Sequence, residues 1–174
     1  MDGARGIAAA AIAAQSHRSQ SRFTASMKII PETKDLFSLV LRTDFSNEAA
    51  WHLICAAMQE SVEGYDGADF RAYVECISDR DYEGLTLEQL IPLAANHFFM
   101  FVVDLTSLTH PERPILVVDL HDELGRTFRV IPAEVYCVQN NLSVWNMGFC
   151  EFADNVDPDG IFRGFDRTGD RPLP

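Results

Sequence analysis

Two carboxylates and one histidine in this chain could do chemistry. Asp44 and Asp104 each follow an apolar run, and His110 comes after Asp104 in a polar loop. Carboxylate oxygens and an imidazole nitrogen can bind a divalent cation, or can serve as general acid and general base. We therefore take Asp44, Asp104 and His110 as candidate catalytic residues. No cofactor and no metal ligand is assigned from the sequence.

Polar side chains beside these three could bind the polar groups of a ligand. The candidate binding residues are Arg42, Thr43, Thr106, Thr109 and Arg113. A structural interpretation competes with this one, because Asp44 could help to cap the following helix and Asp104 could hold the Thr-rich turn after it. His110 and the proline after it could likewise be turn residues.

The strands that must position these residues centre on two apolar runs, 98–105 (FFMFVVDL) and 115–120 (ILVVDL). Both are rich in β-branched and aromatic residues without alternation, which is typical of strands buried on both faces. Segments 37–43, 72–78 and 127–131 are the other predicted strands. Glu75 indicates that 72–78 lies at an edge, where its charge reaches water. On the last strand we expect Arg129 to point outward.

Helices are expected between and after the strands. Ser46 is the predicted N-cap of the first, whereas Thr86 and Gln89 form a capping-box pattern at the second, which ends near residue 95. The third covers 133–139 and is interrupted at 140–141, and the fourth spans 148–155. The sequence thus predicts an α/β fold with an α+β tendency. It has a single mixed sheet of about five strands in the order 2-1-3-4-5, the first three parallel, with a C-terminal antiparallel hairpin and helices on both faces.

This topology brings the candidate residues to one place. In a sheet with the order 2-1-3, ligands favour the crevice at the carboxyl ends of strands one and three. Strand one ends in Arg42, Thr43 and Asp44, and strand three ends in Asp104 and Thr106. The loop after strand three supplies the remaining candidates.

Other chemically suggestive clusters have a structural interpretation. Asp119, His121 and Asp122 are expected to form a solvated hairpin tip. Trp145 and Phe149 are expected to pack in the core. The cysteines are widely spaced and form no C-x-x-C pair, so we interpret them as small buried residues in a reducing compartment.

Composition narrows the classes of partner. The formal net charge is −12 and the sequence pI is about 4.7, and such a field repels phosphate backbones and anionic membranes. No apolar run approaches the roughly 20 residues that span a bilayer. The chain also lacks a Gly-rich phosphate loop, a G-x-S-x-G elbow and an H-E-x-x-H motif. We therefore expect no nucleic-acid or membrane partner, and favour a basic protein.

Length and local composition suggest one domain with two poorly ordered ends. The 174-residue chain has the size of a single domain. We place the α/β domain at 28–165, an N-terminal extension at 1–27 and a loose tail at 166–174. The extension contains Arg5, Arg18 and Arg22 but a single acid, Asp2. Transit peptides share this composition, but a start site misassigned upstream of Met27 would also explain it. The expected location is therefore cytoplasmic, with a mitochondrial one as the alternative.

Six segments together resemble a known family. They are VLRTDFSNEAAW (40–51), YEGLTLEQL (82–90), THPERPILVVDL (109–120), GRTFRVIPAE (125–134), NNLSVWNM (140–147) and EFADNVDPDGIFRGF (151–165). The combination resembles a family of small, uncharacterised actinobacterial and fungal proteins that is classed as a domain of unknown function. The resemblance covers nearly all of 35–165 and leaves out the N-terminal segment. It implies no activity, cofactor or catalytic residue.

Two functions from different classes fit these observations. Negative charge without a catalytic signature favours a non-catalytic protein-binding module of the immunity or adaptor type, because electrostatic attraction speeds association with a basic partner. The alternative is a small-molecule enzyme, for example a metal-assisted hydrolase, that uses Asp44, Asp104 and His110 at the strand-end crevice.

Overall fold

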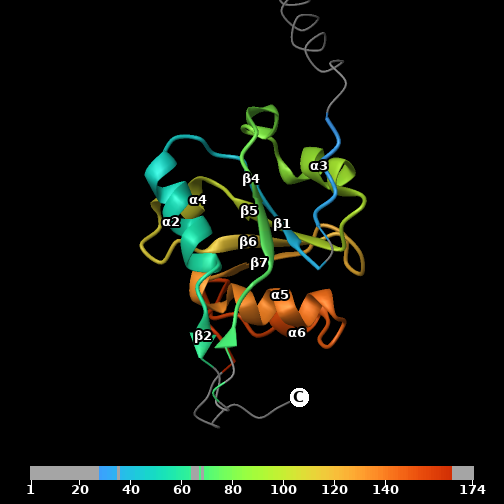
Figure 1. The fold of residues 1–174 in the computed structure, drawn as a ribbon. Helices are drawn as coiled ribbons and strands as arrows, with labels where there is room; N and C mark the ends of the chain where they lie inside the picture. Colours follow the sequence, from blue (N-terminus) through green and yellow to red (C-terminus); the bar gives the residue numbers. More distant parts are fainter. Residues whose placement is uncertain (1–27, 35, 64–66, 68, 166–174) are drawn as a thin grey trace, which may run out of the picture.

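The computed structural model describes residues 28–34, 36–63, 67 and 69–165 (Figure 1). The predictions for 1–27 and 166–174 lie outside these residues. In chain order the elements, with η for a 3-10 helix, are β1 (Ser38–Arg42), α2 (Glu48–Met58), β2 (Val62–Glu63), β3 (Asp69–Phe70), β4 (Val74–Ile77), η1 (Arg80–Tyr82), α3 (Leu87–Leu90), η2 (Ile91–Ala94), β5 (Phe99–Val103), α4 (Leu105–Thr109), β6 (Ile115–Asp119), β7 (Thr127–Val130), η3 (Pro132–Glu134), α5 (Val135–Ser143), α6 (Phe149–Ala153) and β8 (Ile161–Phe162). No helix among the described residues is both long and apolar enough to cross a bilayer.

The main sheet has six strands in the order β4-β1-β5-β6-β7-β8. β1 lies parallel to both β4 and β5, the pairs β5–β6 and β6–β7 are antiparallel, and β8 is parallel to β7. The predicted α/β fold and the order of the first five strands are therefore confirmed, with β4 at the edge. The additional strand, β8, has only two residues, too few to show a periodic pattern. A separate two-stranded sheet, β2 and β3, was not predicted either.

The predicted central strands are central. Every residue of β5 and β1 is buried, and so is all of β6 except Leu116. The buried part of β5 is shorter than predicted, because Phe98 and Leu105 at its ends are each 55% exposed. The alternation of a pleated strand then sends successive side chains into two different cores.

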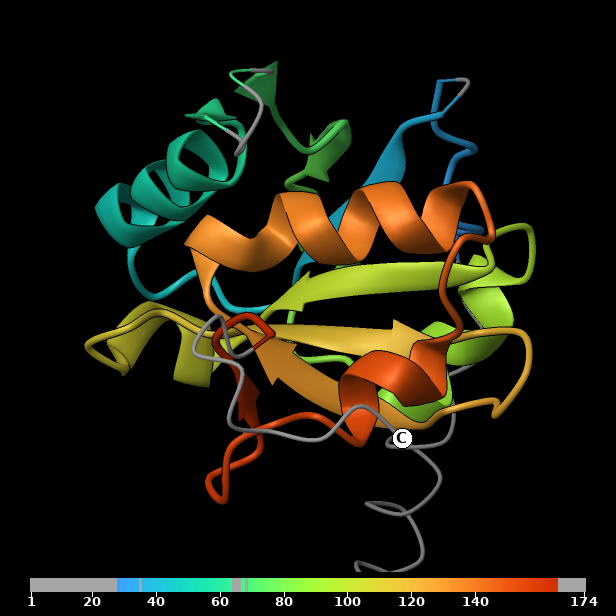
Figure 2. The ribbon, with the colours of Figure 1, turned by 90° about the horizontal axis from the view of Figure 1, so that it is seen from below.

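Helices cover both faces of the sheet and give three layers. Phe101 and Val117 pack beneath α2, α5 and α6 in one core, and Figure 2 shows α5 and α6 over that face. Met100 and Val118 pack in the second core, which η1, α3, η2 and the segment around Ile30 close. Both faces of the central strands are thus covered by other elements.

Three local predictions need correction. The N-cap of α2 is Asn47 rather than Ser46, because the Asn47 side chain accepts a hydrogen bond from the Ala50 amide at 3.0 Å. Residues 140–141 do not interrupt α5, because the helix continues to Ser143; the side-chain Nδ2 of Asn141 donates to the Cys137 carbonyl one turn earlier, at 2.8 Å. The short helix α4 was read as a loop.

The cysteines are less buried than expected. Cys55, Cys76 and Cys137 are half-buried, and Cys150 is exposed. Cys55 on α2 and Cys76 on β4 share a hydrogen bond, which raises the pKa of the Cys55 thiol and lowers that of Cys76. The two thiols therefore lie against each other between the helix and the edge strand.

Candidate functional site

Arg42, at the carboxyl end of β1, is enclosed by its neighbours rather than open to a ligand. The residue is 1% exposed, and its Nη1 donates to Glu48 Oε2 at 2.6 Å, a bond that lowers the pKa of the Glu48 carboxyl. The guanidinium carbon lies 4.3 Å from the ring centre of Phe45 and 5.4 Å from that of Trp51, within the range of cation–π attraction. Nη2 is buried without a hydrogen-bond partner. Through its ion pair with Glu48, Arg42 thus links the start of α2 to β1.

Thr43 and Asp44 support the backbone that joins β1 to α2. Thr43 is buried, and its amide donates to the Val103 carbonyl of β5 at 3.0 Å. Asp44 Oδ1 accepts a hydrogen bond from the Ser46 amide at 2.8 Å and another from the Ser46 hydroxyl. Asp44 therefore closes a turn before α2 instead of capping the helix.

Asp104 caps α4 and holds Arg129. Asp104 Oδ1 accepts from the Ser107 amide at 3.0 Å, and Oδ2 accepts from Arg129 Nη2 at 2.6 Å. Arg129 was predicted to point outward, yet its side chain is only 21% exposed because it binds this carboxylate. Burial alone would raise the pKa of the Asp104 carboxyl, but the hydrogen bonds from Arg129 and Ser107 outweigh it and hold the pKa below its usual value.

The other predicted residues build α4 and the turn after it. Thr109 Oγ1 donates to the Leu105 carbonyl at 2.8 Å, and the Thr106 carbonyl accepts from the His110 amide at 2.9 Å. His110 Nδ1 in turn accepts from the Glu112 amide at 3.2 Å. The Arg113 amide donates to the His110 carbonyl at 3.0 Å, with a positive φ of 50° at Arg113. These are the contacts of a tight turn.

The three candidate catalytic side chains each have a different partner. Asp44 is bound by Ser46, Asp104 by Arg129, and His110 by the amide of Glu112. In the part of the chain that the structure describes, no group of three or more His, Cys, Asp or Glu side chains could hold a metal ion. No contact seen here favours the catalytic interpretation of these residues.

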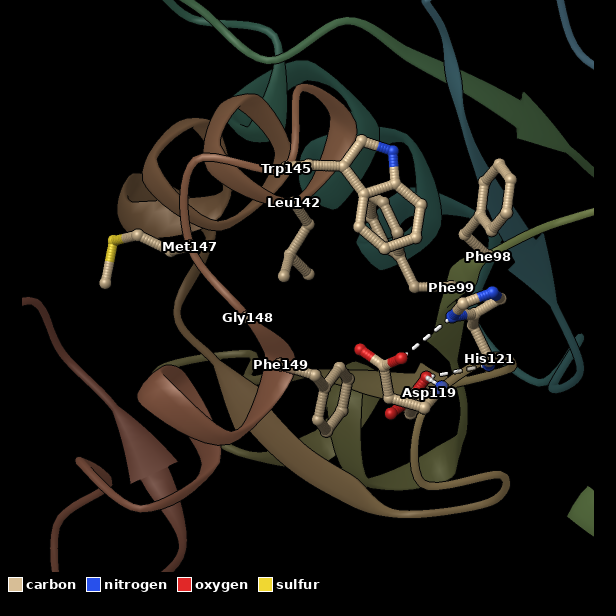
Figure 3. Close-up of a pocket in the computed structure, with 10 residues that line it drawn as sticks. Phe98, Phe99, Asp119, His121, Leu142, Trp145, Met147, Gly148 and Phe149 are labelled. Atoms are coloured by element: carbon tan, nitrogen blue, oxygen red, sulfur yellow. Dashed lines mark hydrogen bonds and ion pairs between the residues drawn. The ribbon is translucent and has the colours of Figure 1, made fainter.

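A small hollow opens to solvent at the other end of the sheet. Phe99 at the start of β5 pairs with Asp119 at the end of β6, so this edge lies opposite the carboxyl end of β5. The lining side chains come from the sheet edge, the loop after β6 and the α5–α6 connection (Figure 3); they include Phe98, Phe99, Asp119, His121, Asp122, Leu142, Trp145 and Phe149. Segments far apart in the sequence thus meet around one concave surface.

Three rings form one wall of the hollow, which we call the aromatic rim: Phe98, His121 and Trp145. Their centroids lie 5.1–5.3 Å apart in edge-to-face pairs, and Figure 3 shows Leu142 and Phe149 across from them. Phe98 is 55% and Trp145 59% exposed. The expectation that Trp145 packs in the core was wrong, whereas Phe149 is buried as expected.

Trp145 has a left-handed backbone, with φ of +57°. It follows the last residues of α5, a position where glycine is usual because a side chain there costs about 1–2 kcal/mol. The Trp145 amide donates to the Leu142 carbonyl at 3.3 Å, and the Asn146 amide donates to the Asn141 carbonyl at 3.0 Å, which closes the helix end. A bulky residue is therefore held in an unfavourable conformation, with its ring largely in water. Such strain is a reason to suspect function.

The polar side of the hollow is a loop built around Asp119. Asp119 is 2% exposed, and its carboxylate accepts hydrogen bonds from the amides of His121, Asp122 and Glu123 at 2.8, 3.2 and 2.8 Å. The predicted hairpin tip is thus solvated at His121 and Asp122 but not at Asp119. His121 Nδ1 lies 2.9 Å from Asp122 Oδ1, and these side chains are 50% and 60% exposed. The loop presents an accessible carboxylate beside the aromatic rim.

Comparison with known proteins agrees with the resemblance seen in the sequence. No curated protein matches the chain. A family model does match residues 37–165, a range that begins just before β1 and includes β8, and so covers the whole main sheet. The chain therefore belongs to the family described as a domain of unknown function, DUF6924.

Proposed function

We propose that this protein is a non-catalytic protein-binding module that docks a basic protein at the hollow and its aromatic rim. The observation that carries the proposal is Trp145, a 59% exposed tryptophan with φ of +57°. The enzyme alternative has no comparable support, because Asp44, Asp104 and His110 are each engaged in local contacts.

The rim has the properties of an interaction hot spot. Tryptophan is enriched among the few interface residues that dominate binding energy, and such residues sit beside pockets that exclude water once the partner is bound. Phe98 and Trp145 lie at the mouth of a hollow whose opposite side is apolar. Because the rings pack against one another at 5.1 Å, little side-chain freedom remains to be lost on binding.

The charge of the chain favours a basic partner. With a formal net charge of −12, the protein attracts cationic surfaces and repels polyanions. Among the described residues that line the hollow, the charged side chains are Asp119 and Asp122, and none is Lys or Arg. Electrostatics of this kind raises the association rate and is weakened by salt. We also propose a cytoplasmic location, in keeping with the cysteine spacing.

The test is affinity capture from lysate with the full chain, in low and in moderate salt. Wild type is compared with Trp145→Ala and with Leu53→Ala, a matched control at a 53% exposed apolar side chain of α2 that does not line the hollow. We expect a basic protein whose recovery falls with salt, and whose affinity drops about 30-fold in Trp145→Ala, the equivalent of a 2 kcal/mol hot spot. Leu53→Ala should bind like wild type. Equal recovery by wild type and Trp145→Ala would refute the proposal, as would the absence of any salt-sensitive partner.

A further inference from the structure

We infer that the hollow binds a cationic side chain of the partner, and arginine in preference to lysine. The inference rests on the proposed function, since it names the group that the docking surface receives. It is carried by two features of the hollow, the exposed aromatic rings of the rim and the carboxylate of Asp122 beside them.

Asp122 is the charge that a cation would meet. Its side chain is 60% exposed, and its side-chain partner among the described residues is the neighbouring His121, at 2.9 Å. Asp119, by contrast, is buried and its oxygens accept three backbone hydrogen bonds. Arg126, a basic residue close by in the sequence, is bound to Glu123 and Asp154. Asp122 therefore remains available to an incoming cation.

The aromatic rim supplies the second attraction. Ring faces carry negative charge density, and among aromatic side chains tryptophan attracts cations most strongly, the more so once water is excluded. The protein already uses this contact elsewhere, because Arg42 and Arg80 lie 4.3 and 4.7 Å from the ring centre of Phe45. Trp145 and Phe98 are more than half exposed, so part of each ring is accessible to a partner.

Arginine fits this combination better than lysine does. Its planar guanidinium stacks on an aromatic ring, forms two parallel hydrogen bonds to a carboxylate, and is less strongly hydrated than an ammonium group. An apolar side chain would contact the rim but would leave Asp122 partly desolvated without a counter-charge, which is unfavourable. A phosphate would be repelled by both carboxylates.

The two indole N–H signals of the full-length protein provide a direct test by NMR. Trp51 is buried and Trp145 is exposed, and loss of one signal in Trp145→Phe assigns them. The probe is a capped pentapeptide with arginine between glycines, compared with peptides that carry lysine, leucine or citrulline, the uncharged isostere of arginine. We expect the arginine peptide to shift the Trp145 signal and leave that of Trp51 in place. The citrulline and leucine peptides should bind at least about tenfold more weakly, and the lysine peptide should fall between.

Two variants with the same net charge test whether peptide binding depends on Asp122 itself. Asp122→Asn and Asp81→Asn each remove one negative charge, but Asp81 is an exposed residue of η1, after the carboxyl end of β4. Asp122→Asn should weaken the arginine peptide about fivefold, the equivalent of a 1 kcal/mol ion pair. Asp81→Asn should bind like wild type, and equal losses in both would mean that only the overall charge matters, against the inference.

The outcomes separate this inference from the proposed function. If citrulline or leucine binds as well as arginine, or if no peptide shifts the Trp145 signal, the cationic occupant is refuted, while Trp145-dependent capture of a partner would still support the module. If Trp145→Ala captures the partner as well as wild type does, both this inference and the proposed function are refuted. A shift of the Trp145 signal on replacing Arg5, Arg18 and Arg22 by glutamine in the full chain, without peptide, would make the chain's own N-terminal segment the occupant and would overturn the inference.

Discussion

Glycine at position 145 should give a more stable protein than alanine does. Trp145 has φ of +57°, where any residue with a Cβ loses about 1–2 kcal/mol and glycine loses nothing. Glycine in turn costs about 0.4–1 kcal/mol more than alanine through the greater freedom of the unfolded chain. At the midpoints of these two ranges, Trp145→Gly is more stable than Trp145→Ala by about 0.8 kcal/mol.

Comparing Trp145→Gly with Trp145→Ala cancels the free energy that is lost with the indole ring. Both variants lose the contacts of the ring with Phe98 and His121, at 5.1 and 5.2 Å between centroids. Val144 is the matched control, because it is 64% exposed and has an ordinary φ of −108°. There the ranking should reverse, with Val144→Gly less stable than Val144→Ala by about 0.5–1 kcal/mol.

Urea denaturation of the four variants, followed by far-UV circular dichroism, measures these free energies of unfolding. The slopes should be equal, so that midpoints report stability alone. If Trp145→Ala is as stable as Trp145→Gly, the backbone at this position is not strained, and the argument that strain marks a functional tryptophan fails. If the ranking holds, the protein keeps a less stable residue at the one place where its ring completes the aromatic rim.

Two further predictions concern the sheet. Asp104→Asn keeps a good N-cap for α4 but loses the ion pair with Arg129, whose side chains are 27% and 21% exposed, so unfolding should become easier by about 1–2 kcal/mol at pH 7. Because the pKa of Asp104 is lowered in the folded protein, this stabilisation is present above the unfolded pKa of about 3.9 and is lost as the pH falls through the folded pKa. If wild type and Asp104→Asn still differ in stability by the same amount below both pKa values, the ion pair is not the cause of the difference. Val117→Asp, at 0% exposure in β6, should abolish folding, because an unpaired buried carboxylate costs several kcal/mol against a total of about 5–15 kcal/mol. Leu53→Asp at an exposed position of α2 should cost about 1 kcal/mol or less in circular dichroism melts, and similar soluble yields of the two variants would mean that Val117 is not enclosed.

The sequence was sufficient for the sheet because burial on both faces leaves a pattern. The runs that became β5 and β6 contain no alternation, and Glu75 marked the edge strand β4, so the strand order followed from short right-handed connections. β8 was not predictable in the same way. Its two residues pair with Arg129 and Val130 of β7, a contact that depends on tertiary structure alone.

The candidate site was harder to predict, because local partners decide whether a polar residue is available. Asp104 stands at the expected strand end, but the Arg129 side chain that occupies it comes from β7 and leaves no trace in the pattern around Asp104. The residues of the hollow were predicted less well in a different respect. Asp119, His121 and Asp122 were noticed as a cluster, while Trp145 was assigned to the core, since a left-handed turn after α5 decides its exposure. The available signal was the polar stretch around Trp145, with asparagines at 140, 141 and 146, which suits a helix end better than a core.

The two ends of the sheet differ in how their carboxylates are neutralised. At the carboxyl ends of β1 and β5, Arg42 binds Glu48 and Arg129 binds Asp104, so these two acids already have a guanidinium partner. At the hollow, the ion-pair partner of Asp122 among the described residues is His121, which is charged only when protonated. The net charge of −12 attracts a basic protein from any direction, and salt screens that attraction over about 8–10 Å. A contact buried in the hollow is screened much less. Salt should therefore act mainly on the rate of association, and the aromatic rim mainly on the rate of dissociation.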